Sequence, residues 1–72
     1  MKYTRYITTA GILYQADDNK IRIRKPFGSD EWLFEVFENG LWQGLSGFEK
    51  ITAAKKAADA YRRNPKTYIQ YL

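Results

Sequence analysis

An Asn-Gly pair at positions 39 and 40 separates two segments rich in aromatic and aliphatic residues, residues 31–38 and 41–48. Asn-Gly is the strongest short-range signal for a two-residue hairpin turn, because such a turn requires positive φ angles that these residues tolerate. The pair therefore predicts two antiparallel strands joined by a tight turn. In the register that this turn sets, Phe37 faces Trp42 and Phe34 faces Leu45.

The two faces of this hairpin differ in composition, because side chains alternate between the faces of a strand. One face is apolar and is the predicted core face; it carries Trp32, Phe34, Val36, Leu41 and Leu45. The second face carries Leu33, Glu35, Phe37, Trp42 and Ser46. We expect the aromatic pair of the second face to be partly exposed.

A helix in residues 53–63 is predicted to cover the core face. Alanine, the best helix former, recurs there. Thr52 is the expected N-cap, and Asn64-Pro65 ends the helix. Small and aromatic side chains share one face of it at helical spacing: Ala54, Ala57, Ala58 and Tyr61.

The N-terminal part predicts further strands. Residues 3–16 are rich in Tyr, Thr and Ile, which favour strands, and Gly11 marks a bulge or a break within them. Residues 17–19 form a turn signal. Residues 20–24 alternate strictly and place both of their isoleucines on one face.

Together these segments predict an α+β fold, in which a small antiparallel sheet of three to four strands carries one C-terminal helix on one face. Residues 1–72 are expected to form a single domain. Within it, residues 66–72 are either a frayed tail or an added strand.

The residue types that carry most catalytic and metal chemistry are missing. The sequence contains no cysteine and no histidine, so it offers no thiolate or imidazole. We expect a binding protein without enzymatic activity, cofactor or metal, although a paired-carboxylate reaction at Glu35 and Glu38 stays open. No segment approaches the ~18 apolar residues of a membrane helix, and residues 3–9 lack an export signal. A cytoplasmic location without membrane contact is therefore expected.

Charge is distributed in blocks along the chain. Residues 1–25 carry six basic and two acidic groups, residues 26–49 carry five acidic and no basic groups, and residues 50–72 carry six basic and one acidic group. Two interpretations stay open. The basic blocks form a footprint for phosphates, or the acidic middle pairs with the basic ends in the folded chain.

A basic row is predicted to lie beside the aromatic pair of the second face, because the isoleucines that alternate with it point to the core. Arginine contacts phosphates or reads guanine edges, and aromatic rings pack against sugars or stack on unpaired bases. The predicted nucleic-acid site, with DNA as the favoured ligand, consists of Lys20, Arg22, Arg24, Phe37 and Trp42. Secondary basic groups come from the helix: Lys55, Lys56, Arg62 and Arg63.

The pattern resembles DNA-binding domains built from a three-stranded sheet and one helix. The residues that carry the resemblance are Arg22-x-Arg24, Gly28, Trp32, Glu35-Val36, Leu41-Trp42-x-Gly44, Gly47-Phe48, Thr52 and Ala57-Ala58-Asp59-Ala60-Tyr61. Over residues 21–63 they resemble the plant ethylene-response type and the N-terminal arm-binding domains of phage and transposon integrases. The resemblance implies that arginines and tryptophans of the sheet enter the major groove, a role that falls to Arg22, Arg24 and Trp42. Glu35 and Phe37 depart from the basic face of those domains.

Protein binding is the alternative function. An accessory or inhibitor protein, such as one from a phage or mobile element, would use either the Phe37–Trp42 patch or the acidic segment of Asp30, Glu31, Glu35 and Glu38. Phe37 and Trp42 could also be a structural cross-strand pair. Glu35 on the same face would repel phosphates, which counts against DNA binding.

Overall fold

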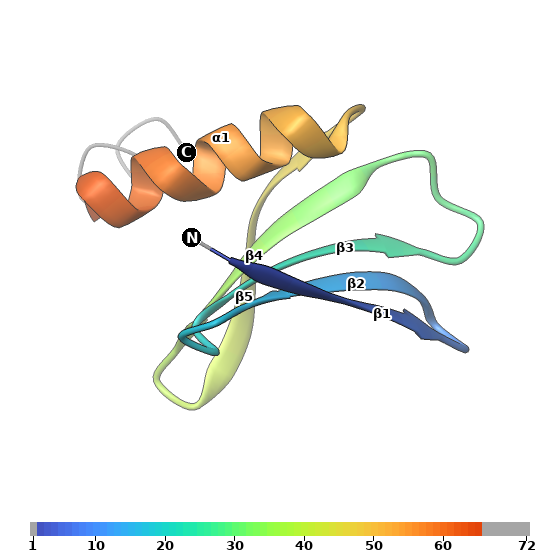
Figure 1. Ribbon diagram of the computed structural model, residues 1–72, viewed down its shortest axis with the longest axis horizontal. Coiled ribbons are helices and arrows are strands. Elements are labelled where there is room, and N and C mark those ends of the chain that lie inside the picture. The colour runs from blue at the N-terminus through green and yellow to red at the C-terminus, as the bar shows by residue number, and fades with distance from the viewer. Residues whose placement is uncertain (1, 66–72) are drawn as a thin grey trace.

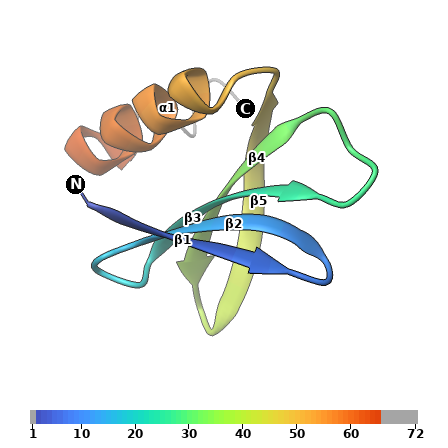
Figure 2. The same ribbon diagram turned by 45° about the vertical axis from the view of Figure 1, so that its right-hand side comes forward.

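The computed structural model describes residues 2–65 and shows an α+β fold, as the sequence predicts. Five antiparallel strands follow one another in the sheet in chain order, and one helix follows them. The elements are β1 Tyr3–Thr8, β2 Gly11–Ala16, β3 Ile21–Pro26, β4 Trp32–Glu38, β5 Leu41–Phe48 and α1 Ile51–Arg63. The helix lies across one face of a strongly twisted sheet (Figures 1 and 2). The expected tail or strand in residues 66–72 lies outside the described residues.

The sheet has one strand more than the three to four that the sequence predicts, because residues 3–16 form a hairpin instead of one extended segment. Gly11 marks the break, with a φ of +133°. A Cβ at Gly11 would lie 2.2 Å from the carbonyl oxygen of Lys25, so only glycine allows this approach. The N–H of Phe27 also donates to the carbonyl oxygen of Ala10 at 2.8 Å. The first turn is thus held by the loop that follows β3.

The core lies between α1 and the sheet face that it covers. Its buried side chains are Ala16, Ile21, Ile23, Phe34, Val36, Ala54 and Ala58. The helix buries alanines, which let its backbone approach the sheet, and Ala57 and Tyr61 pack at the edge of the core. The predicted apolar face of the helix is confirmed.

The predicted core face of the last hairpin is confirmed at four of its five positions. Phe34 and Val36 are buried, and Trp32 and Leu45 pack against the core while partly exposed. The prediction is wrong for Leu41, which is 66% exposed. Leu41 begins β5 directly after the β4–β5 turn and pairs with Glu38, beyond the buried residues of this hairpin.

The predicted hairpin register is correct near the turn and shifts further away. Phe37 pairs with Trp42, as expected, but Phe34 pairs with Ser46 instead of Leu45. A register shift after Phe34 leaves Leu45 as an extra residue on β5, which is the pattern of a β-bulge. The bulge moves Ser46 away from the face on which the sequence places it.

The helix begins two residues earlier than predicted. Lys50 is the N-cap residue and Ile51 the first helical residue, so Thr52 lies inside the helix and makes no capping hydrogen bond. Ile51 packs against the core. We attribute the early start to this packing, which outweighs the preference for a polar cap. At the other end, Asn64 is the C-cap and its N–H donates to the carbonyl oxygen of Ala60.

Candidate nucleic-acid interface

The sheet face opposite α1 collects most of the predicted binding residues. We call it the outer face and define it by Arg22, Arg24, Glu35, Phe37 and Trp42. These residues lie together because β4 pairs with β3 on one side and with β5 on the other. Arg22 is opposite Glu35, and Phe37 is opposite Trp42.

Glu35 joins the two arginines of the outer face. Its Oε1 accepts hydrogen bonds from Nε of Arg22 at 2.6 Å and from Nε of Arg24 at 2.8 Å. The residue is only 6% exposed, so its charge needs these partners. Burial by itself raises the pKa of Glu35, but the hydrogen bonds and charges of Arg24 and Arg22 outweigh it and hold the pKa below its ordinary value of 4.5.

The aromatic pair of the outer face is partly exposed, as predicted. Phe37 is 40% exposed, and the centres of the Phe37 and Trp42 rings are 5.2 Å apart. The guanidinium carbon of Arg22 lies 4.2 Å from the centre of the Trp42 ring, which is within the range of a cation–π contact. One face of Trp42 is thus occupied by the same arginine that binds Glu35.

Lys20 lies in the turn before β3, whereas the sequence places it in the strand. It is exposed, and it lines a hollow together with Phe37, Glu38 and Arg62. Neither Arg22 nor Arg24 lines this hollow, so Lys20 lies outside the arginine cluster.

The four basic residues of the helix lie on the other side of the sheet from the outer face, because α1 covers the core face. Lys55 is held over two tyrosine rings, 5.3 Å from the centre of Tyr3 and 5.0 Å from that of Tyr14. Arg62 forms an ion pair with Asp18. The structure therefore separates the helix group from Arg22 and Arg24. Arg62 shares a hollow with a residue of the sheet group, Lys20. Lys56 and Arg63, the remaining members of the helix group, are exposed.

The acidic segment considered for protein binding does not form a continuous surface. Glu35 is buried beneath the arginines. Glu38 accepts a hydrogen bond from the hydroxyl of Tyr61 at 2.8 Å. Asp30 and Glu31 lie in the loop between β3 and β4. The aromatic pair is at the other end of β4, beside the β4–β5 turn.

Sequence reasoning missed the bond between Glu35 and the arginines, although the signal was present. Strand alternation placed Arg22, Arg24 and Glu35 on one face, and a carboxylate there can neutralise an arginine as readily as it repels a phosphate. A second missed feature is the exposure of Ile7 and Phe27 near the first turn. No local pattern in the sequence indicated it.

Within residues 2–65, no group of three or more acidic, histidine or cysteine side chains could hold a metal ion. No helix in the same range is long and apolar enough to cross a membrane. Comparison with known proteins gives no matching family model, curated protein or solved structure.

Proposed function

We propose that the protein binds nucleic acid, with duplex DNA as the favoured ligand, through the outer face of its sheet. The observation that carries this proposal is the arrangement of two arginines on an accessible sheet face, oriented by one buried carboxylate. Arg22 and Arg24 both use Nε to bind Glu35. In the described residues no hydrogen bond involves their terminal nitrogens, which are the atoms that reach phosphates and guanine edges.

Orientation is the advantage of this arrangement. A free arginine loses side-chain entropy when it binds a ligand, whereas Arg22 is already fixed by Glu35 and by the ring of Trp42. The cost is electrostatic, because the carboxylate cancels one of two positive charges. We therefore expect the face to position a few phosphate or base contacts rather than attract the duplex over a long range.

Space beside the arginines supports the same proposal. A hollow of about 250 Å³ is lined by Arg22 and Arg24, with Thr8 and Leu13 from the first hairpin. It offers room for a phosphate group next to both guanidinium groups.

Trp42 favours a duplex over a single strand. Arg22 covers one face of its ring and Phe37 lies 5.2 Å from its centre. An unpaired base could stack on Trp42 only by displacing one of these neighbours, whereas a sugar–phosphate backbone could pack against the exposed edge of the pair.

The test is fluorescence anisotropy with labelled duplex DNA, single-stranded DNA and duplex RNA, each at low and at physiological salt. A double variant, Arg22→Gln with Arg24→Gln, removes both charges and leaves Glu35 with hydrogen-bond donors. We expect weaker duplex binding and a log–log salt slope flattened by about one to two units. The matched control, Lys56→Gln with Arg63→Gln, changes the net charge equally on the helix side and should alter the slope less. Absence of binding at low salt, or equal effects of the two double variants, would refute a site on the outer face.

A further inference from the structure

The first strand of the sheet has an unpaired edge. β1 pairs with β2 on one side, and within residues 2–65 no strand pairs with its other side. The carbonyl oxygen of Lys2 accepts from the N–H of Asp17, so Lys2 faces β2. Because such bonds alternate along an antiparallel strand, the N–H and C=O groups of Tyr3, Arg5 and Ile7 point away from the sheet.

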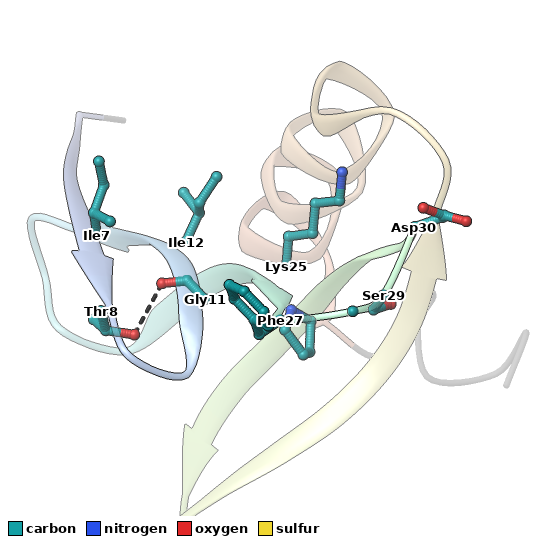
Figure 3. A pocket seen from close by; sticks show the side chains of 10 residues that line it. Ile7, Thr8, Gly11, Ile12, Lys25, Phe27, Ser29 and Asp30 are labelled. Atoms are coloured by element: carbon teal, nitrogen blue, oxygen red, sulfur yellow. Dashed lines mark hydrogen bonds between the residues drawn. The ribbon is translucent and has the colours of Figure 1, made fainter.

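An apolar surface adjoins this edge. Ile7 is 75% exposed and Phe27 is 87% exposed. With Ile12 they line a pocket of about 430 Å³ between the first turn and the loop after β3. Figure 3 shows Ile7 and Ile12 on one side of this pocket, and Lys25 and Phe27 beside them. The side chain of Ile7 thus connects the open edge to the pocket.

The charge is positive around Arg5 and Ile7, whereas the Tyr3 end of the edge lies within the field of Asp59, Asp18 and Asp17. Arg5 is the one charged residue of β1, and Lys2 precedes it. Lys25 lines the pocket and lies over the ring of Trp32. In residues 2–65 none of these three cations has an ion-pair partner. One acidic residue, Asp30, lines the far side of the pocket.

We propose that the β1 edge binds an extended acidic segment of another protein, which adds to the sheet as an antiparallel sixth strand. The segment has an apolar side chain opposite Ile7, an acidic one opposite Arg5 and an apolar one opposite Tyr3. Main-chain bonds to the three outward-facing residues supply affinity, and alternate side chains supply selectivity. This site is separate from the outer face, and it does not depend on nucleic-acid binding.

The probe is a labelled heptapeptide, Thr-Val-Thr-Glu-Thr-Val-Thr, titrated into the full chain by fluorescence anisotropy. In the proposed register its valine and glutamate residues exchange hydrogen bonds with β1, and its threonines do not. N-methylation of both valines and the glutamate should weaken binding at least about tenfold through lost hydrogen bonds and a steric clash. N-methylation of three threonines is the matched control and should change binding little. An equal loss of affinity in the two N-methylated peptides would overturn strand addition. Equal binding of a peptide with lysine in place of glutamate would overturn the acidic preference.

Two variants of one residue test the same edge from the protein side. Arg5→Ala removes the charge and keeps the outward N–H, whereas Arg5→Pro also removes the N–H, a change that edge strands tolerate. We expect Arg5→Pro to bind the peptide at least about tenfold more weakly than Arg5→Ala.

If Arg5→Pro does not fold, the comparison of the two N-methylated peptides still tests strand addition. A wild-type dimer that Arg5→Pro dissociates, without any peptide binding, would assign the edge to a second copy and overturn the proposal. Duplex DNA binding that Arg5→Pro weakens relative to Arg5→Ala, without any peptide binding, would overturn it in favour of nucleic acid.

Discussion

The guanidinium carbon of Arg22 lies 4.2 Å from the centre of the Trp42 ring. Arg22 belongs to β3 and Trp42 to β5, so the contact passes over β4, whose Glu35 binds the same arginine at 2.6 Å. One side chain therefore links three adjacent strands on the outer face. The stability of the outer face and any function of it therefore depend on the same three side chains, those of Arg22, Glu35 and Trp42.

Glu35→Gln should destabilise the protein and reduce its sensitivity to acid. Because the folded-state pKa of Glu35 is lowered, its contribution is present above the pKa of the unfolded chain and is lost as the pH falls through the folded-state pKa. We expect a loss of about 2–3 kcal/mol in the free energy of unfolding near neutral pH, since two partly buried arginines lose a charged acceptor. Urea unfolding measured from neutral pH down to about pH 2 should show a shallower acid decline in the variant. Parallel curves for wild type and variant would contradict this role of Glu35.

Gly11→Ala should destabilise the first turn. Its Cβ would lie 2.2 Å from the carbonyl oxygen of Lys25, and the residue has a φ of +133°. We expect a cost of roughly 2–4 kcal/mol from strain and displaced backbone. Gly44→Ala is the matched control, because a Cβ there meets nothing within 4 Å and its φ is not in the left-handed region. Chemical denaturation of both variants measures the difference, and equal stabilities would show that the turn tolerates the displacement.

Gly40 and Gly11 show why the sequence predicted the β4–β5 hairpin and not the β1–β2 hairpin. Asn39 and Gly40 both adopt positive φ, and their identity alone indicates the turn. The first turn has no such pair. It depends on contacts between Gly11 and the loop after β3, which are distant in sequence and invisible to a local pattern.

The sequence predicted which residues share the outer face. It did not predict the hairpin register beyond Glu35 or the burial of Glu35. Alternation placed Arg22, Arg24, Phe37 and Trp42 on one face, and the structure places them there. The position of Leu45 depends on a bulge between the Glu35–Gly44 and Phe34–Ser46 pairs, so a register counted from the turn fails beyond Glu35. The buried state of Glu35 likewise depends on how closely its neighbours pack.

Tyr3→Phe should be neutral or should stabilise the protein by up to about 1 kcal/mol, because the Tyr3 hydroxyl is buried and has no hydrogen-bond partner in the described residues. Burial, with a smaller contribution from Asp59, raises the pKa of Tyr3 to about 12. A raised pKa stabilises the folded chain below the unfolded value of about 10, and this stability is lost as the pH rises from there towards 12. Unfolding measured from neutral to alkaline pH should therefore show a weaker alkaline decline in the variant.

Tyr61→Phe is the control for that experiment. The pKa of Tyr61 is also raised to about 12, by burial and by the hydrogen bond to Glu38. The variant loses a hydrogen bond, so we expect it to be less stable than wild type by up to about 1 kcal/mol at neutral pH. A destabilised Tyr3→Phe variant would mean that the Tyr3 hydroxyl has a partner.

Replacing both outer-face arginines by lysine separates charge from geometry in the proposed nucleic-acid site. Arg22→Lys with Arg24→Lys keeps both positive charges but lacks the planar group that can bind Glu35 through Nε and a ligand through its terminal nitrogens. Because counterion release follows charge, the log–log salt slope should stay within about half a unit of wild type. Affinity for duplex DNA should nevertheless fall by about three- to tenfold, since a lysine ammonium lacks the oriented pair of donors. Anisotropy titrations over a salt series give both quantities from one data set. An unchanged affinity would mean that the face acts only as a source of positive charge, and the orientation of the arginines by Glu35 would then have no part in binding.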